Sequence, residues 1–440
     1  MINETDVNNA LKTIIDPDFN KDIVSLGFVQ NIKIEGSHIS LDLALTTPAC
    51  PVKETFKKSA EDNLLKLKGI TKVSVNMTVL PQKAMPQNAA PTQTLKNVRS
   101  IIAISSCKGG VGKSTVAGYF AMELARRGYK VGLVDCDIHG PSIPTLFNLN
   151  KVDLYQNEHK QLIPVEKNNL KLMSFGFLLG DAPAVMRGPI VTRYVQQLLV
   201  GTDWGELDYL FIDMPPGTGD VQLTITQMLR LNGAVIVTTP QTLSLVDVSR
   251  GILMFERVNV PILGLIENMS YFICDNCDKK HYIFGNHQTQ SLTKRFGLET
   301  IAELPILPQF IQKIDEPIAN EFIMSAVDKL IRAVGKQSIS ESQIPKIEFD
   351  QNEITLTFEG QKPISISNHD LRANCQCALC INELTGEAIL KGSDVNKDIA
   401  AKEVFPLGNY ALGIIWNDGH SSGIYPYNLI RNLAENKSLK

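Results

Sequence analysis

The chain has 440 residues. At about 150 residues per domain, this length predicts about three domains and excludes a single small module. Lys and Arg number 43 and Asp and Glu number 46, so the formal net charge is −3 and bulk positive charge cannot recruit nucleic acid. With 44% hydrophobic and 20% charged residues, the chain can bury proper cores and is not expected to be disordered.

The first residues of the chain and its cysteines indicate the cellular compartment. Glu4 and Asp6 are the charged residues among the first ten, and no apolar block follows, so we expect no secretory or transit peptide. No run of 18 apolar residues occurs, so we expect no membrane span. We therefore place the chain in the cytoplasm. Five of the eight cysteines form two tight clusters, which in a reducing compartment more often hold metal than disulfides.

Residues 1–80 predict a small α+β domain. Apolar and polar residues alternate at Ile32–Ile34 and at His38–Leu45, which indicates two strands. A helical stretch near Val52–Leu67 and a further strand pattern at Lys72–Leu80 follow. Both element types therefore occur within one short domain.

Residues 81–97 separate this domain from the next as a linker. The first 14 of them contain three prolines, little charge and no apolar period. Such a segment cannot bury itself and is expected to be extended and semi-flexible.

Residues 98–335 show short, continuous apolar runs separated by helical stretches. Runs that are apolar on both faces indicate strands of a parallel sheet covered by helices on each side. The runs are Ile101–Ser105, Val131–Asp135, Tyr209–Asp213, Ala234–Thr239 and Ile262–Glu267. We predict an α/β domain with a mainly parallel sheet.

Residues 343–436 predict a third, small and β-rich domain. After a polar break at 336–342, the period returns to two at Ile354–Phe358. A strand-like stretch, Tyr410–Trp416, follows the second cysteine cluster. The complete chain is thus an α/β core flanked by two small domains.

A glycine-rich stretch, Cys107–Thr115, lies between the first apolar run of the core and a helix-compatible run. Such a turn points successive backbone N–H groups and the positive end of a helix at one place, which suits a polyphosphate. Lys113 would neutralise the β- and γ-phosphates, and the Ser114 hydroxyl would ligate Mg²⁺. Cys107 replaces the usual first glycine, and Lys108 is a second lysine within the loop. The candidate phosphate-binding residues are Gly109, Gly110, Val111, Gly112, Lys113, Ser114 and Thr115.

Acidic residues end two of the predicted strands. Asp135 and Asp137 follow one apolar run, and Asp213 ends another before a Gly/Pro turn. In a parallel sheet these ends lie at the same edge as the phosphate loop, where Mg²⁺ needs carboxylates. Cys136 and Cys107 are expected to be small buried side chains rather than redox groups.

Three stretches together resemble the deviant P-loop ATPases, a family that includes septum-site and chromosome-partition ATPases, nitrogenase iron protein and the Mrp/ApbC iron–sulfur carriers. They are Lys108–Thr115, Asp135–Ser142 and Asp213–Gly219. The resemblance implies a P-loop NTPase core and a nucleotide-sandwich homodimer in which Lys108 reaches the partner's phosphates. It also implies that Asp137 helps to position the attacking water, that Asp213 holds Mg²⁺ through water and that Asn268 reads adenine. Lys108, Lys113 and Asp137 are therefore the candidate catalytic residues.

Cys274 and Cys277 follow the last predicted strand of the core. Both sulfurs can reach one metal but supply only half of a four-sulfur shell, whereas two chains supply four thiolates for a [4Fe-4S] cluster. A redox pair, or a half zinc site completed by His281 or His287, remains an alternative. The layout resembles the Mrp/ApbC carriers, in which an Ile-Phe-Gly segment trails such a pair, as at Ile283–Gly285.

The last domain carries a complete ligand set for one metal ion. Cys375, Cys377, Cys380 and His420 form a Cys₃His set, which structural Zn²⁺ prefers and which would hold together a domain with a modest core. An iron–sulfur site and metal-free thiols are the alternatives. The pattern is similar to the zinc-binding N-terminal domain of gamma-butyrobetaine hydroxylase, but nothing oxygenase-like accompanies it.

The first domain resembles the SufT-like domain of iron–sulfur assembly proteins at Asp16–Gly27 and Leu45–Pro51. Pro48 and Pro51 would fix the loop that holds Cys50 ahead of a helix, a setting that can lower the pKa of a thiol. Cys50 is either a transient cluster or client contact or an inert packed cysteine.

We predict an ATP-hydrolysing iron–sulfur cluster carrier of the Mrp/ApbC type, with ATP, Mg²⁺, a [4Fe-4S] cluster and Zn²⁺ as cofactors. It would act as a homodimer whose partners are client apo iron–sulfur proteins and a cluster donor, without nucleic acid or membrane. ATP and Mg²⁺ would close the dimer and alter the spacing of the four bridging sulfurs.

Three alternative functions predict different sequence features or experimental outcomes. A positioning ATPase that binds membrane or DNA needs a basic amphipathic helix or a basic face, whereas the tail Leu429–Lys440 is short and mixed in charge. A non-catalytic zinc scaffold would deliver clusters without Lys113. A reductase like nitrogenase iron protein holds its cluster with separated single cysteines, whereas this chain has an adjacent pair.

Overall fold

The computed structural model describes residues 2–80, 95, 97–138, 140–179, 188–217, 219–258, 260–285, 289–306, 314, 320–340, 345–358, 361–375, 377, 380, 389–390, 392–407, 411–421 and 423–437. The chain forms two compact units, Met1–Ala90 with Met324–Ile339 and Pro91–Ile323 with Ser340–Lys440. Among the described residues, no helix combines the length and the hydrophobicity that crossing a membrane requires. The predicted linker at 81–97 lies outside the described residues, apart from Leu95 and Asn97.

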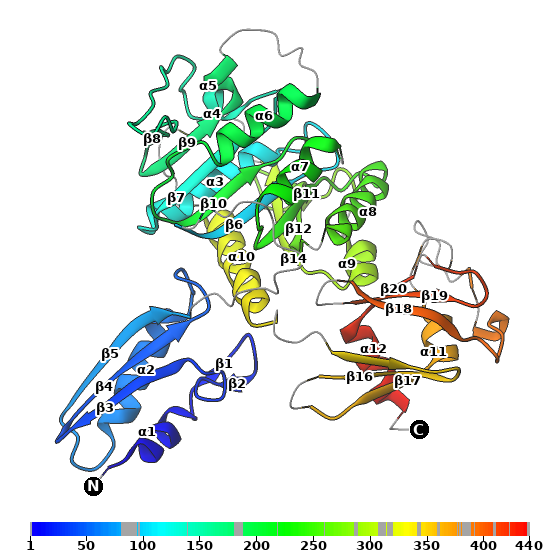
Figure 1. Cartoon of the computed structure of the whole chain (residues 1–440), viewed down its shortest axis with the longest axis horizontal. Helices are drawn as coiled ribbons and strands as arrows, with labels where there is room; N and C mark the ends of the chain where they lie inside the picture. Colours follow the sequence, from blue (N-terminus) through cyan, green and yellow to red (C-terminus); the bar gives the residue numbers. More distant parts are fainter. Residues whose placement is uncertain are drawn as a thin grey trace. The chain divides into compact units, whose positions relative to one another are not determined.

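The first unit contains a three-stranded sheet in the order β3-β4-β5 (Figure 1). β3 and β4 are antiparallel and β4 and β5 are parallel, with α2 as the crossover between them. Its elements are α1 (Glu4–Leu11), β1 (Ile15–Asp16), β2 (Lys21–Asp22), β3 (Val29–Glu35), β4 (His38–Leu45), α2 (Lys53–Leu65) and β5 (Lys72–Val79).

The pattern of apolar residues explains this unit. Helix α2 buries Phe56, Ala60 and Leu64, which are spaced by four residues and therefore share one face. Buried and half-buried side chains alternate along the first part of β4, as expected of a strand with one face on the core. The predicted strands at His38 and Lys72 begin at the predicted residues, and the predicted helix is confirmed.

Helix α10 (Glu321–Ser340) contributes its residues 324–339 to the first unit. Gly335 lies so close to Thr46 that a Cβ at this glycine would meet Thr46 Oγ1 at 2.5 Å. Arg332 Nη1 pairs with Asp18 Oδ1 at 3.4 Å. Two stretches of chain far apart in sequence therefore build this unit.

The second unit contains a nine-stranded sheet among the described residues, in the order β13-β12-β11-β6-β10-β7-β9-β8 with β14 paired to β12. All pairs are parallel except β8 with β9 and β12 with β13. The elements in chain order are β6 (Val98–Ser105), α3 (Lys113–Arg126), β7 (Val131–Asp135), α4 (Ile143–Leu146), β8 (Val165–Lys167), β9 (Leu170–Ser174), α5 (Phe175–Leu179), α6 (Gly188–Leu199), β10 (Leu207–Asp213), α7 (Asp220–Met228), β11 (Gly233–Thr238), α8 (Thr242–Arg257), β12 (Ile262–Ile273), β13 (Lys280–His281), α9 (Gln290–Phe296) and β14 (Thr300–Ile306).

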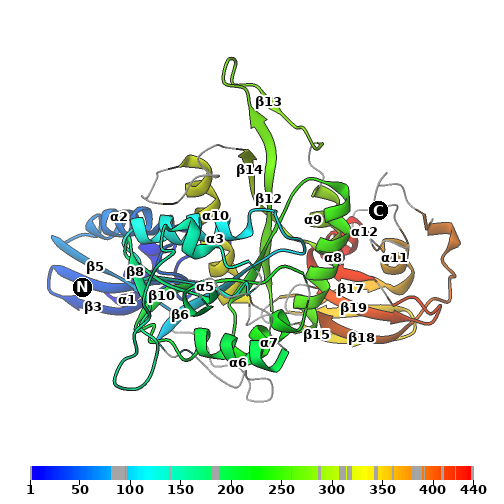
Figure 2. The same cartoon turned by 90° about the horizontal axis from the view of Figure 1, so that it is seen from above.

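The mainly parallel α/β core is thereby confirmed. Side chains of β6, β7, β10 and β11 are almost all buried on both faces, because helices cover the sheet. β12 is longer than predicted: it continues from Glu267 to Ile273 and pairs with β13 as a hairpin that projects from the sheet (Figure 2). The prediction ended at Glu267 because the polar residues Asn268 and Ser270 interrupt the apolar run that follows.

The last part of the second unit forms two three-stranded antiparallel sheets, β15-β16-β17 and β18-β19-β20. Their shared core includes Trp416, Tyr425 and the three clustered cysteines, so the predicted β-rich domain is confirmed. The elements are β15 (Lys346–Phe349), β16 (Glu353–Thr357), β17 (Ile364–Ser367), α11 (Asn368–Ala373), the 3₁₀-helix η3 (Gly392–Asp394), β18 (Ala401–Leu407), β19 (Ala411–Trp416), β20 (Ile424–Pro426) and α12 (Tyr427–Lys437).

Candidate functional site

The glycine-rich loop turns between β6 and α3, and the helix begins at Lys113. Gly110 and Gly112 have φ of +78° and +84°, a left-handed conformation that favours glycine. A Cβ at Gly112 would collide with the side-chain amide of Asn268. The loop therefore brings backbone N–H groups to the N-terminus of α3, where a phosphate is favoured.

Lys113 and Asp213 form a buried ion pair at this edge of the sheet. The Lys113 ammonium also donates to Ser114 Oγ at 3.3 Å. The second carboxylate oxygen of Asp213, Oδ2, is buried and has no hydrogen-bond donor among the described residues. Burial raises the pKa of Asp213, which shows how poorly this carboxylate is compensated. The hydroxyl and this oxygen are hard donors of the kind that suit Mg²⁺.

Asp135 organises the segment that follows β7. Its Oδ2 accepts from the Ile143 N–H at 3.2 Å and from Ser174 Oγ at 3.0 Å. Its Oδ1 accepts from the Asp137 N–H at 3.0 Å. Burial, with the negative charge of Asp213 as the next cause, raises the pKa of Asp135 to about 7. Ser174 was not predicted, because it ends a strand that carries no motif.

Asp137 and Lys108 are the more accessible members of the predicted catalytic set. Asp137 Oδ1 accepts from the Gly140 N–H at 3.3 Å. Lys108 has a 35% exposed side chain, and its ammonium lies 3.5 Å from Asp247 Oδ2. Asp247 also pairs with Arg250 at 3.6 Å. Sequence analysis did not find Asp247, because it lies on α8 without a motif of its own.

An apolar cavity of about 250 Å³ adjoins the loop. Asn268 is its amide-bearing wall and donates from Nδ2 to the carbonyl oxygen of Val111 at 2.9 Å. The cavity is lined by Gly112, Thr115, Val116, Tyr119, Asn268, Met269, Phe284, Leu304, Pro305, Ile306 and Ile323. Apolar walls with one amide suit the nucleoside part of a bound nucleotide.

Cys274 and Cys277 occupy the tip of the β12–β13 hairpin (Figure 2). The turn is closed by the Cys274 N–H, which donates to Lys279 O at 3.0 Å, and by the Asp278 N–H, which donates to Cys274 O at 2.9 Å. Cys277 is exposed and Cys274 half-buried. A backbone N–H from Asn276 and the Cys277 side chain lower the pKa of the Cys274 thiol.

The residues around this pair decide how many metal ligands one chain can supply. Within the described residues, no His, Asp or Glu joins Cys274 and Cys277 in a group of three possible ligands. His281 is thus not grouped with the two cysteines among the described residues, and His287 lies outside the described residues. One chain offers two sulfurs here, on a surface that solvent reaches.

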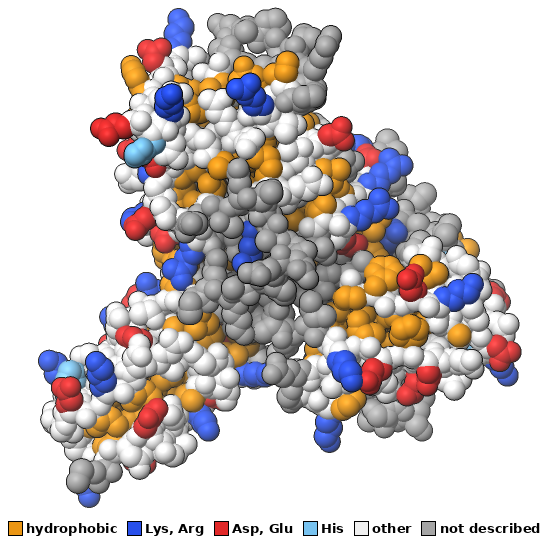
Figure 3. Space-filling model, viewed as in Figure 1, with side chains coloured by type: hydrophobic (Ala, Val, Ile, Leu, Met, Phe, Trp, Pro, Cys, Tyr) orange, Lys and Arg blue, Asp and Glu red, His pale blue; other side chains and the backbone are white. Residues whose placement is uncertain are grey.

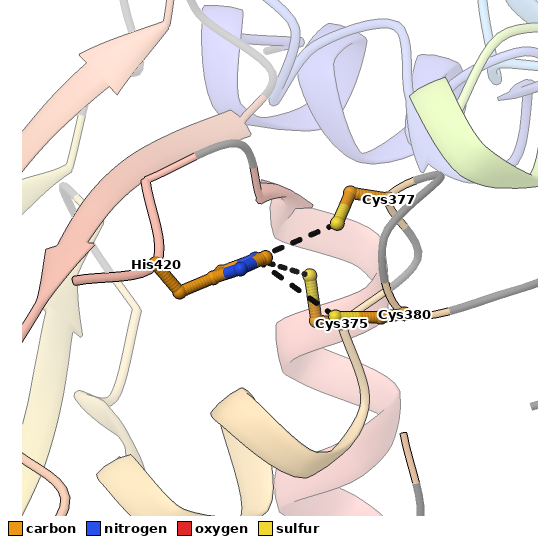
Figure 4. Close-up of side chains that lie close together, drawn as sticks. All are labelled: Cys375, Cys377, Cys380 and His420. Atoms are coloured by element: carbon orange, nitrogen blue, oxygen red, sulfur yellow. Dashed lines mark hydrogen bonds between the residues drawn. The ribbon is translucent and has the colours of Figure 1, made fainter. Parts of the chain in front are cut away.

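The second cysteine cluster is a closed set of four ligands (Figure 4). His420 Nε2 lies 3.3 Å from Cys375 Sγ, 3.5 Å from Cys377 Sγ and 3.9 Å from Cys380 Sγ. All four ligand atoms lie within 4.8 Å of one another. Metal–sulfur bonds of about 2.3 Å and a metal–nitrogen bond of about 2.0 Å give S···N edges of about 3.5 Å in a tetrahedron. The donor set and spacing therefore fit one zinc ion.

Two further groups that the sequence did not reveal support these sulfurs. The buried Arg372 donates from Nη1 to Cys380 Sγ at 3.4 Å and from Nε to Asp418 Oδ2 at 2.9 Å. Tyr425 is hydrogen-bonded to Cys375, and Trp416 Nε1 donates to Tyr425 Oη at 3.0 Å. Arginine can only donate, so its contact favours a sulfur that carries negative charge.

The remaining cysteines are packed side chains. Burial raises the pKa of Cys107 to about 11, and Cys136 is fully buried, in agreement with the prediction that neither is a redox group. Burial also raises the pKa of Cys50. The expectation that the loop before α2 lowers the pKa of Cys50 is therefore wrong, because desolvation outweighs the nearby backbone N–H.

Comparison with known families agrees with the three resemblances. Residues 97–338 match the model described as NUBPL iron-transfer P-loop NTPase. Residues 4–77 match the iron-sulfur cluster assembly protein model, and residues 346–431 match the gamma-butyrobetaine hydroxylase-like, N-terminal model.

The chain also matches relatives over most of its length. The chloroplastic Fe-S cluster assembly factor HCF101 of Arabidopsis thaliana is 41% identical over 447 residues, 98% of this chain and 82% of that protein. The iron-sulfur cluster carrier protein of Synechocystis is 40% identical over 346 residues, 77% of this chain and 97% of that protein. A nucleotide-binding protein from Archaeoglobus fulgidus, solved with ADP, is 38% identical and covers 55% of this chain and 90% of its own, with a TM-score of 0.44. This chain therefore belongs to the family of iron-transfer P-loop NTPases.

Proposed function

We propose that this protein is an ATP-dependent carrier that binds an iron–sulfur cluster between two copies of the chain and passes it to apoproteins. The observation that carries the proposal is one hairpin, with an exposed Cys277 and a half-buried Cys274 at its tip and with its other end lining the cavity beside the phosphate loop. The relatives named as carriers and assembly factor support it.

The phosphate loop would hold ATP and Mg²⁺. Lys113, now paired with Asp213, would pair with the β- and γ-phosphates instead, and the Asp213 carboxylate and the Ser114 hydroxyl would then hold Mg²⁺. Mg²⁺ neutralises phosphate charge when it is bound. Asp137 helps to position the attacking water, and the Asn268 carbonyl oxygen is an acceptor that suits the amino group of adenine.

The dimer supplies what one chain lacks. Two thiols per chain give four sulfurs across a two-fold axis, the number that a [4Fe-4S] cluster requires. In the free chain, Asp247 holds the Lys108 ammonium. In the dimer Lys108 turns to the phosphates of the partner, so that nucleotide loading and cluster holding involve the same association.

The Cys₃His set would hold Zn²⁺ permanently. Cys375, Cys377 and Cys380 are buried, and the four protein ligands leave no open position for a substrate. Zn²⁺ cross-links the end of α11 to the turn after β19 when it is bound. Its role is therefore structural.

A positioning ATPase is less well supported. On the face shown in Figure 3, acidic and basic side chains are interspersed and no basic field is seen. The comparisons name iron transfer and cluster assembly, which a membrane- or DNA-bound ATPase would not explain.

Anaerobic reconstitution with iron and sulfide tests the proposal. Wild-type protein is expected to bind about four irons per dimer and to activate an apoprotein that needs a [4Fe-4S] cluster. The Cys274→Ala/Cys277→Ala variant is expected to lose both, whereas Cys136→Ala, which changes a fully buried cysteine, serves as the control. Undiminished iron binding and transfer by the double variant would contradict the proposal.

A further inference from the structure

Both strands of the cysteine hairpin return to one cavity. Asn268, at the start of the projecting part of β12, lines the cavity beside the phosphate loop. Phe284, three residues beyond β13, lines the same cavity. The segment between these two residues carries Cys274 and Cys277 at its far end. Whatever fills the cavity therefore touches both ends of the segment that carries the cysteine pair.

The start of the hairpin is held on a buried carboxylate. Glu267 is fully buried, and its Oε1 accepts from Ser270 Oγ at 2.6 Å. Its Oε2 accepts from the Thr289 N–H at 3.3 Å. The chain before and after the hairpin is thus tied to one anchor, and the hairpin itself projects beyond it.

The backbone between the anchor and the hairpin is irregular. The pairing of β12 with β14 skips from Glu267 to Tyr271, which marks a bulge. Within it Met269 has φ of +55°, a conformation that costs a non-glycine residue free energy and persists where the surroundings impose it. This bulge directs Asn268 toward the loop and changes the course of the strand that leads to Cys274.

Side-chain and backbone contacts join the two strands of the hairpin. Phe272 pairs with His281, and Lys280 Nζ lies 4.4 Å from the centre of the Tyr271 ring. The rings of Tyr271 and Tyr282 are 5.5 Å apart. These contacts connect the end of the hairpin near the cavity with the turn that carries the cysteine pair.

We propose that Phe284 is a wall of the base site, so that a bound nucleotide base packs on its ring and fixes the orientation of the Cys274/Cys277 pair. The inference rests on the proposed function in one respect, namely that the base of ATP occupies this cavity. The Phe284 side chain is 42% exposed at the wall of this mainly apolar cavity. A base stacked on its ring would therefore remove ring surface from water.

The neighbouring residue provides a matched control. Ile283 is 63% exposed but does not line the cavity. Both side chains are large, apolar and on the same stretch of chain. A general effect of losing apolar surface would appear in Phe284→Ala and Ile283→Ala alike, whereas a base contact would appear only in the former.

The first measurement is nucleotide affinity by calorimetry with Mg-ADP on the metal-free full chain. Phe284→Ala is expected to weaken binding by about tenfold, the scale of one base–aromatic stack. Ile283→Ala is expected to bind as the wild type does, and Phe284→Tyr is expected to restore binding because it keeps the ring. Equal affinity of Phe284→Ala and wild type would overturn the inference.

The second measurement is the rate at which iodoacetamide modifies Cys277 in cluster-free protein, with and without saturating Mg-ADP. Nucleotide is expected to slow modification at least threefold in wild type and Ile283→Ala and to leave the rate in Phe284→Ala unchanged. A missing response in wild type, or a full response in Phe284→Ala, would refute the coupling.

Cluster binding separates this inference from the proposed function. Phe284→Ala without nucleotide is expected to load iron as wild type does, because both cysteines are intact. If wild type bound no cluster but kept the nucleotide response, the carrier function would fail and the coupling would stand. If clusters were carried but the nucleotide response were absent, the reverse would hold.

Discussion

The two cysteine clusters of this chain differ in almost every physical respect. The pair Cys274/Cys277 lies on a projecting hairpin, with one sulfur-bearing residue exposed and two ligands in all. The Cys₃His set is buried in a core, has four ligands and is contacted by Arg372 and Tyr425. The first arrangement needs a second molecule to complete its metal shell, and the second needs none.

Under the proposed function, this difference separates a metal that is passed on from one that is retained. An incomplete, solvent-facing pair allows a partner to approach the sulfurs, which transfer of a cluster requires. A complete and buried shell opposes exchange, as in structural zinc sites. Two cysteine motifs in one chain thus suit different roles, because one is solvent-facing and incomplete and the other is buried and complete.

The largest expected difference concerns stability. Replacing Cys377 by Ser is expected to abolish zinc binding and to unfold the last domain, because zinc binding free energy in such sites is on the order of 10 kcal/mol. Replacing Cys277 by Ser is expected to leave the unfolding temperature unchanged. Zinc analysis and calorimetry of the two full-length variants measure this, and an unchanged zinc content of Cys377→Ser would contradict the structural role.

The next effect concerns ATP binding and hydrolysis, which are expected to influence the Cys274/Cys277 pair but not the Cys₃His set. Lys113→Ala is expected to reduce ATP hydrolysis on the order of 100-fold or more, because a preorganised charge at the transferred phosphate is lost. Zinc content should not change. Phosphate release and metal analysis test both parts, with Lys130→Ala, which removes an exposed ion pair with Glu206, as the control. Loss of zinc in Lys113→Ala would break the separation of the two sites.

A smaller effect is expected for the group behind the zinc ligands. Arg372→Ala is expected to weaken zinc affinity by about 10- to 100-fold, because Cys380 loses a charged donor and Asp418 loses its partner. Competition with a chelator measures the affinity. Arg372→Lys is expected to recover part of it, and full affinity in Arg372→Ala would show that the contact contributes only packing.

The smallest expected effect is a few-fold difference in thiol reactivity. The pKa of Cys274 is below its ordinary value, and that of Cys50 is above it. At a pH between the two pKa values, Cys274 is mostly a thiolate and Cys50 is mostly a thiol. Alkylation of Cys274 should therefore begin at a lower pH than alkylation of Cys50. Mass spectrometry of metal-free protein across a pH series measures both rates. Modification of Cys50 as fast as Cys274 at pH 7 would be the contrary result.

The sequence predicted the parts of this molecule that local pattern controls. The strand Val131–Asp135 is found with its predicted bounds, because four consecutive apolar or small residues that end in an acidic turn have few other solutions. The loop Lys108–Thr115 and both cysteine clusters were found because their spacing alone specifies the chemistry. The structure brings the four predicted Cys₃His ligands together.

Contacts between segments that are distant in the chain could not be predicted from the sequence. Asp247 beside Lys108 and Arg372 beside Cys380 are ordinary helix residues until the fold sets them against their partners. The raised pKa of Cys50 likewise comes from packing around a loop whose own pattern suggested the opposite. The length of β12 was missed because the polar residues Asn268 and Ser270, which are buried in the structure, interrupt the apolar run.

One oxygen at the phosphate site has a wider consequence. Asp213 Oδ2 is buried without a donor among the described residues, a defect that costs a folded protein about 1–3 kcal/mol. A ligand that supplies the missing partner also stabilises the fold by mass action. Occupancy of the phosphate site would then protect the whole chain against unfolding, and against proteases that attack the unfolded chain.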